Sequence, residues 1–241
     1  MDVSWEEFGW EQLGDGIGRR RLPVWDATVA LVIGPAGALL FDTGSSLREG
    51  AEIRTQVQAL LGGRRVPHIA LSHAHFDHVL GTGVFAGARI HAAAGMDAAL
   101  SSSGLEELRL DAVRHGVPEA EASAAADVVI RPHHLLTREG RLDLGGGREV
   151  VLSPAGPAHS PHDLVAWIPD AGVLLAGDLI EESGEPQAGP DATPRRWPQA
   201  LDRLLELGGP DARYVPGHGS VVDAKFVLAQ RESLAARYGV S

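Results

Sequence analysis

SHAHFDH, residues 72–78, places three histidines and an aspartate close together in a chain of 241 residues that has 11 histidines in all. The chance that this composition yields His-x-His-x-Asp-His by accident is on the order of one in a thousand. Protonated imidazoles this close together would repel one another, and buried ones would each need a partner. A divalent cation meets both requirements, so the stretch predicts a metal site.

The spacing inside the stretch divides its polar residues into two groups. His73 and His75 are two residues apart and can leave the end of a strand on the same side. Asp77 and His78 belong to the following turn and point elsewhere, so two adjacent metal ions follow more naturally than one. Because the chain has no cysteine, imidazole and carboxylate groups must hold any metal.

The sequence before the stretch predicts strands and a helix that lead into it. Residues 17–41 read as an antiparallel meander of short strands that ends at Asp42, and residues 48–61 place apolar side chains on one helical face. The segment VPHIALS, residues 66–72, is then a buried strand. SHAHFDH therefore begins where a strand ends, which is where open α/β sheets present their site residues.

The remainder of the chain alternates apolar segments with helix formers. Residues 95–128 are rich in Ala, Glu and Leu and predict a helical insert, whereas residues 181–194 carry Gly and Pro and predict a surface loop. Further strands and helices are expected at residues 148–154, 163–169, 172–178, 194–208, 212–216 and 223–239. No linker separates them, so we expect a single α/β domain over residues 1–241.

Three later segments, taken with SHAHFDH, make the chain resemble the metallo-β-lactamase superfamily of metallohydrolases. AHS carries His159, AGD carries Asp178 and PGHG carries His218, each at the end of an expected strand and in the family's order and approximate spacing. The resemblance covers nearly the whole chain, from the meander to the last helix. It implies a four-layer αββα sandwich in which helices flank two mixed sheets.

Carried over residue by residue, the resemblance implies two Zn²⁺ ions per chain and seven ligands. The ligands are His73, His75 and His159 for one ion, Asp77, His78 and His218 for the other, and Asp178 as the bridge between them. Nitrogen and oxygen donors suit zinc, although iron and manganese accept similar sets. The resemblance also implies a hydrolase in which a metal-bound hydroxide attacks an acyl carbon. Asp77 is then a catalytic residue that orients the nucleophile or moves its proton.

Two other residues are expected to support the site without holding metal. Asp42 stands at the end of a strand, where similar proteins carry an aspartate that supports the metal-site loops from the second shell. The alternative role for Asp42 is a turn-capping carboxylate. His162 is close enough to His159 in sequence to line the pocket. The histidines that match no ligand position are His91, His115, His133 and His134.

The substrate is left open by the family, because such a centre can attack esters, thioesters, lactones, lactams or phosphodiesters. Metallo-β-lactamases usually have a cysteine where Asp178 stands and a lysine three residues later. This chain has Glu181 there, which would repel the carboxylate of a β-lactam. Glyoxalase II-type thioesterases usually have a further histidine in place of Ser72. These departures favour a small ester or lactone, with a thioesterase or a β-lactamase as alternatives.

Two different classes of function also stay open. Related proteins use a single iron ion for sulfur oxidation, and elemental analysis separates such a dioxygenase from a two-zinc hydrolase. A non-catalytic, zinc-stabilised scaffold is the other alternative. It accounts less well for seven ligands, because a structural zinc needs four and no open position.

Charge and hydropathy define the expected partners and location. The formal net charge of −11 repels phosphate backbones and anionic membrane surfaces. We therefore expect a small-molecule substrate and neither nucleic acid nor membrane as a partner. The first residues lack the basic start and apolar run of a signal peptide, and no later run reaches membrane-spanning length. The expected location is the cytoplasm, and the oligomeric state is left open.

Overall fold

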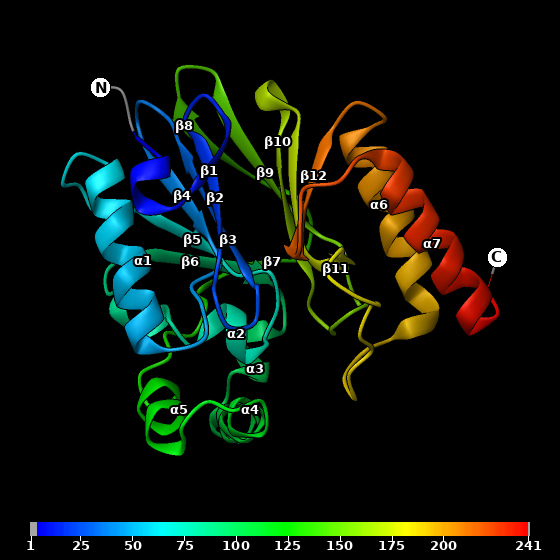
Figure 1. Ribbon diagram of the computed structural model, residues 1–241, viewed down its shortest axis with the longest axis horizontal. Coiled ribbons are helices and arrows are strands. Elements are labelled where there is room, and N and C mark those ends of the chain that lie inside the picture. The colour runs from blue at the N-terminus through cyan, green and yellow to red at the C-terminus, as the bar shows by residue number, and fades with distance from the viewer. Residues whose placement is uncertain (1–3, 241) are drawn as a thin grey trace.

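Two β-sheets lie face to face in the computed structural model, which describes residues 4–240 (Figure 1). The first sheet consists, in spatial order, of β1 (Glu11–Gly14), β2 (Ile17–Arg21), β3 (Thr28–Ile33), β4 (Ala38–Phe41), β5 (His68–Ala70), β6 (Arg89–Ala93) and β7 (His134–Leu136). The second consists of β12 (Arg213–His218), β11 (Val173–Glu181), β10 (Leu164–Ile168), β9 (Arg148–Pro154) and β8 (Gly140–Gly145). Each sheet is therefore built from one consecutive half of the chain.

Both sheets are mixed. Neighbouring strands are antiparallel from β1 to β4 and parallel from β4 to β7. In the second sheet β8, β9, β10 and β11 pair antiparallel, whereas β11 and β12 are parallel.

Helices cover the outer face of each sheet (Figure 1). The first sheet is covered by α1 (Leu47–Leu60), α4 (Ser102–Arg114) and α5 (Glu119–Ala126), and the second by α6 (Trp197–Gly208) and α7 (Ala224–Tyr238). Shorter helical segments are α2 (Phe76–Val79), α3 (Met96–Ala99), η1 (Glu6–Phe8), η2 (Thr82–Val84), η3 (Pro169–Ala171) and η4 (Pro194–Arg196). The predicted αββα sandwich is confirmed, and α3, α4 and α5 occupy the segment expected to be helical, residues 95–128.

Side-chain alternation along the inner strands builds the layers. In β3, Val29 and Leu31 pack in the core under the helices, whereas Ala30 and Val32 pack in the core between the sheets. Successive residues of a strand face opposite sides of its sheet, so an apolar run such as TVALVI buries both faces.

The strands expected around SHAHFDH correspond to β2, β3, β4 and β5, and the expected helix to α1. Strands β1, β6, β7 and β8 were not predicted from the sequence. They are short or rich in Ala, Gly and charged residues, and their strand conformation depends on pairing with neighbours rather than on local propensity.

The segment after β4 fixes the position of α2, which carries part of SHAHFDH. The backbone N–H and the hydroxyl of Thr43 both donate to the carbonyl of His78, each at 2.9 Å. Gly81, just after α2, lies so close to this segment that a Cβ on it would be 1.9 Å from the carbonyl oxygen of Thr43. A Cβ on Gly50 of α1 would in turn be 2.7 Å from the carbonyl oxygen of Gly81. Two glycines thus allow α1, α2 and the β4 end to pack backbone against backbone.

Within residues 4–240, none of the helices combines the length and apolar character needed to cross a bilayer.

Gly81→Ala is expected to destabilise the protein by about 2 kcal/mol, because the added methyl group overlaps backbone atoms that cannot move independently. The midpoint of urea unfolding measures the effect. Gly184→Ala is the matched control, since a Cβ there meets nothing within 4 Å. Equal midpoints for the two variants would show that the close packing at Gly81 is not required.

Candidate metal centre

The site lies at one end of the two facing sheets, where segments from both halves of the chain meet. SHAHFDH follows β5 in the first sheet, and His159 lies in the loop between β9 and β10. Asp178 belongs to β11, and His218 is the last residue of β12. The structure brings together all seven residues that the sequence proposed as ligands.

One group consists of His73, His75, His159 and Asp178, whose potential ligand atoms all lie within 4.8 Å of one another. His159 Nε2 is 3.1 Å from His75 Nδ1 and 3.5 Å from Asp178 Oδ2. His73 Nε2 is 3.6 Å from the same oxygen of Asp178. Three imidazoles thus face one carboxylate oxygen.

The second group consists of Asp77, His78 and His218. His218 Nε2 lies 3.3 Å from Asp77 Oδ2 and 3.3 Å from Asp178 Oδ2. His78 Nε2 lies 3.1 Å from Asp178 Oδ1. The carboxylate of Asp178 therefore contacts both groups, which is the position of a bridging ligand.

In each of the five imidazoles, the ring nitrogen that points away from Asp77 and Asp178 has a hydrogen-bond partner, and a partner that can only accept fixes the tautomer. His218 Nδ1 donates to the carbonyl of Trp25 at 2.7 Å, and His159 Nδ1 donates to the carbonyl of Gln187 at 3.2 Å. A carbonyl can only accept, so the proton of each ring is on the outward nitrogen. In the neutral ring, the inward Nε2 of each then carries the lone pair that a metal ion needs.

The other three imidazoles follow the same arrangement. The pairs are His78 Nδ1 with Asp42 Oδ2 at 2.8 Å, His75 Nε2 with Asp191 Oδ2 at 3.2 Å, and His73 Nδ1 with Ser72 Oγ at 2.8 Å. Five inward nitrogens therefore face Asp77 and Asp178, and the outward bonds are those that orient histidine ligands in metal sites.

Three buried atoms at the centre form no hydrogen bond among the described residues: His73 Nε2, His78 Nε2 and Asp178 Oδ1, the last two although they lie 3.1 Å apart. Leaving buried polar atoms without partners is costly. A divalent cation coordinated by these atoms removes that cost, and the imidazole and carboxylate donors suit such an ion. The residues present therefore fit a metal centre.

Protons compete with a metal ion for the imidazole nitrogens of this site. Burial lowers the pKa of His159 to about 4, so this ring is neutral and free to bind metal at neutral pH. Burial also disfavours a charged His218, but the carboxylate of Asp178 outweighs it and raises the pKa of His218 to about 11. Without metal, the carboxylates thus hold a proton on His218. Metal binding there would displace that proton.

Asp42 links the ends of β4 and β5 beneath the site. Its Oδ1 accepts from the backbone N–H of Ser72 at 2.7 Å, and its Oδ2 accepts from His78 Nδ1. The residue is buried and has a left-handed backbone with φ of 63°. Asp42 therefore contacts a candidate ligand directly and lies outside the ligand groups.

His162 belongs to none of the ligand groups found among the described residues. Its ring lies against Gly95, where an added Cβ would be 2.3 Å from His162 Cε1. The next residue, Asp163, was not singled out from the sequence. Its carboxylate accepts from the backbone N–H groups of Ala158 and Ser160, and so holds the loop that presents His159. The signal was present in the sequence as an aspartate four residues after His159.

Glu181 was read from the sequence only as a charge, yet it forms a third candidate group with Asp178 and His218. On a regular strand Asp178 and Glu181 would face opposite sides of the sheet. The register between β11 and β12 shifts after Gly177, and Glu181 pairs with His218. Regular strand periodicity could not have found this contact. Burial raises the pKa of Glu181 to about 7.

Asp191 is the other contact that the sequence did not indicate. It comes from the loop expected at residues 181–194 and bonds His75. The unmatched histidines lie outside the ligand groups, although His115, directly after α4, stacks on Phe76 at 5.2 Å between ring centroids.

The imidazole nitrogens of this site surround buried carboxylates at the strand ends of an αββα sandwich. This arrangement is that of the metal-dependent hydrolases. The chain belongs to the metallo-β-lactamase superfamily, because the model of that family matches residues 22–218.

Individual relatives agree with this assignment. Metallo-beta-lactamase type 2 of Bacillus cereus is 28% identical over 85 residues, a match that spans 34% of this chain and 33% of that protein. The fold is similar to that of the metallo-β-lactamase FIM-1 from Pseudomonas aeruginosa in its mono-zinc form, with a TM-score of 0.71 and 18% identity over 96% of each chain. It is also similar to a metallo-β-lactamase from Pontibacter korlensis, with a TM-score of 0.73 and 18% identity over 93% of this chain and 97% of that one.

Asp42→Asn is expected to weaken metal binding about 10- to 100-fold. If the amide donates to His78 Nδ1, the imidazole proton moves to Nε2 and blocks the inward nitrogen. Competition with a chromophoric chelator measures the affinity. Asp170→Asn is the control, since Asp170 pairs with Arg148 on the surface. Unchanged metal affinity in Asp42→Asn would contradict the proposed role of Asp42.

Proposed function

We propose that the protein is a dinuclear zinc hydrolase that cleaves a small ester or lactone. The observation that supports this most directly is the convergence of five inward imidazole nitrogens on Asp77 and Asp178. We assign His73, His75 and His159 to one ion and Asp77, His78 and His218 to the other, with Asp178 between them. When bound, such cations lower the pKa of a water molecule to near neutrality and polarise an acyl oxygen.

Asp77 is proposed as the catalytic residue of the chain itself. Its carboxylate is buried, and Oδ2 lies 3.3 Å from His218 Nε2 and 3.6 Å from His78 Nε2. These contacts hold it in one orientation at the centre of the site. A carboxylate fixed in this way can accept the proton of the attacking water and return it to the leaving group.

The proposed preference for neutral acyl substrates comes from the charges around the centre. Glu181 and Asp191 both lie against candidate ligands, and neither forms a salt bridge to arginine or lysine among residues 4–240. A carboxylate-bearing substrate would meet repulsion from Asp191 and, above the pKa of about 7 of Glu181, from Glu181 as well. This argument disfavours β-lactams, although the curated relative from Bacillus cereus is a metallo-β-lactamase.

Ser72 bears on the thioesterase alternative. Its N–H donates to Asp42, its carbonyl accepts from the N–H of Leu164 at 2.7 Å, and its hydroxyl bonds His73. Its side chain also lies against Gly177, where a Cβ would be 2.8 Å from Ser72 Cβ. All polar groups of Ser72 are thus used in supporting the site. The position at which glyoxalase II-type enzymes carry a further histidine offers no ligand here.

We also propose a small-molecule substrate, no nucleic-acid or membrane partner, and a cytoplasmic location. The acidic balance of the chain and the absence of cysteine support these three proposals.

The zinc-loaded protein is expected to hydrolyse neutral esters or lactones faster than a thioester or a cephalosporin. Chelation is expected to abolish activity and added zinc to restore it, with about two zinc ions per chain by elemental analysis. Chromogenic substrates measure the rates. Faster hydrolysis of the cephalosporin would overturn the preference for neutral substrates.

Two other results would overturn the hydrolase proposal itself. One iron ion per chain with oxygen uptake on a persulfide would assign a sulfur dioxygenase. No turnover on any of these substrates, with loss of fold on chelation, would assign a zinc-stabilised scaffold.

Asp77→Asn is expected to lower kcat about 100-fold at full metal content, because an amide cannot accept the proton. Metal content is measured on the same sample as kcat. Asp202→Asn, which removes a surface partner of Arg231, is the control. Normal turnover in a metal-replete Asp77→Asn protein would exclude the catalytic role.

A further inference from the structure

A basic segment runs through the middle of this acidic chain. Between residues 53 and 96 the sequence contains one acidic residue, Asp77, which is buried at the metal centre. The same segment contains four arginines: Arg54, Arg64, Arg65 and Arg89. The net charge of this segment is therefore positive, opposite in sign to the formal net charge of −11 for the whole chain. Such a local excess attracts anions that the rest of the surface repels.

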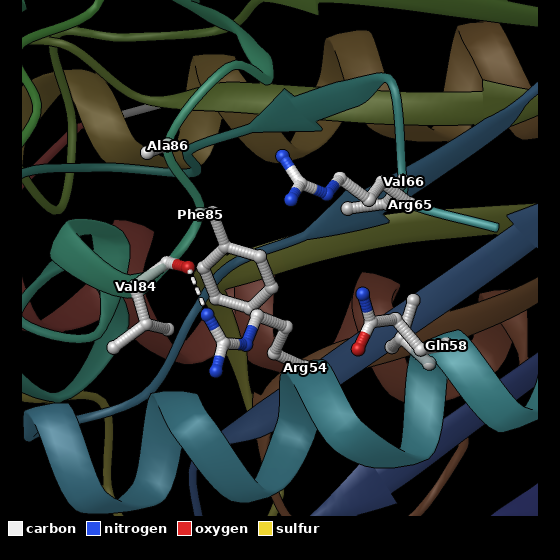
Figure 2. Close-up of a pocket in the computed structure, with 8 residues that line it drawn as sticks. Arg54, Gln58, Arg65, Val66, Val84, Phe85 and Ala86 are labelled. Carbon is white, nitrogen blue, oxygen red and sulfur yellow. Dashed lines mark hydrogen bonds between the residues drawn. The ribbon is translucent and has the colours of Figure 1, made fainter. Parts of the chain in front are cut away.

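Two of these arginines line one pocket on the outer side of the first sheet (Figure 2). The pocket has a volume of about 170 Å³ and lies between α1 and the segments before β5 and before β6. The lining residues are Arg54, Val57, Gln58, Arg65, Val66, Val84, Phe85 and Ala86. None of them belongs to a candidate ligand group, so this pocket is distinct from the metal centre.

The charged lining of the pocket consists of two guanidinium groups, Arg54 and Arg65. Arg54 Nη1 donates to the carbonyl of Val84 at 3.1 Å, which orients this guanidinium and leaves its other N–H groups available (Figure 2). Within residues 4–240, neither Arg54 nor Arg65 forms a salt bridge. The amide of Gln58 lies at the same pocket. Two unpaired guanidinium groups favour a carboxylate or phosphate oxygen over a neutral group.

The remaining lining is apolar. Val57, Val66 and Phe85 are 1%, 7% and 4% exposed, so they form a rigid floor of which only a small apolar area reaches the pocket. In the view of Figure 2 the side chains of Arg54 and Arg65 extend toward the ring of Phe85. An inorganic anion would leave this floor uncovered, whereas an organic anion can cover it.

We propose that this pocket binds a small organic anion, with its carboxylate at Arg54 and Arg65 and its apolar body against Phe85. Pockets for drug-sized ligands measure about 300–1,000 Å³, so the smaller volume here suits a single ring or a short branched chain. The ligand class is thus a monocarboxylate with one apolar group.

The test uses benzoate as the probe and the zinc-loaded, full-length protein. Benzoate is expected to cause saturable shifts in the backbone amide NMR signals of Val57, Val66 and Phe85. Benzamide has the same ring without the charge and is expected to bind about tenfold more weakly. Inorganic phosphate, which lacks the ring, is expected to compete poorly.

Arg65→Gln is expected to weaken benzoate binding about tenfold, because it removes one charge-assisted contact. Arg64→Gln is the matched control, since Arg64 is the neighbouring arginine, carries the same charge and does not line the pocket. Arg54→Gln provides a second variant from a different element and is expected to weaken binding by a similar factor.

Several results would overturn the proposal. They are equal losses in Arg64→Gln and Arg65→Gln, equal affinity for benzamide and benzoate, phosphate binding as tight as benzoate, or shifts confined to residues 72–78. The first would indicate general attraction to the basic segment, and the last would indicate binding at the metal centre.

Discussion

The carboxylate of Asp178 is the group on which the rest of the site depends. Both of its oxygens lie within 3.6 Å of imidazoles that come from both halves of the chain. No residue larger than glycine fits beside this carboxylate at position 217, since a Cβ on Gly217 would be 1.8 Å from Asp178 Oδ1. Gly217 of PGHG thus lets β12 approach β11 closely enough for Asp178 and His218 to meet.

The candidate ligands could be singled out because their chemistry is rare in the sequence and their order is that of a known family. Few other roles account for the three histidines and the aspartate of SHAHFDH together with the later His159, Asp178 and His218. The αββα fold was predicted from the resemblance to that family, whereas the strand pattern alone predicted only part of the two sheets. What the sequence did not reveal were contacts that depend on irregular backbone, since Glu181 reaches the site through a register shift and Asp191 through a long loop.

Two segments outside the sheets, residues 95–128 and 181–194, contact the candidate metal centre or the helix that carries part of it. The loop at residues 181–194 bonds His75 through Asp191 and His159 through the carbonyl of Gln187. The helical segment at residues 95–128 reaches α2 through the stacking of His115 on Phe76. Both segments therefore support rings or backbone that carry candidate ligands, in addition to any contact with substrate.

Each sheet is formed by one half of the chain, and this division separates the ligands as well. The first half supplies His73, His75, Asp77 and His78, and the second supplies His159, Asp178 and His218. Neither half alone offers the complete set that is proposed for either ion. A metal ion bound as proposed would reach high affinity only once the two halves have docked, and would cross-link two layers that apolar contacts otherwise hold together.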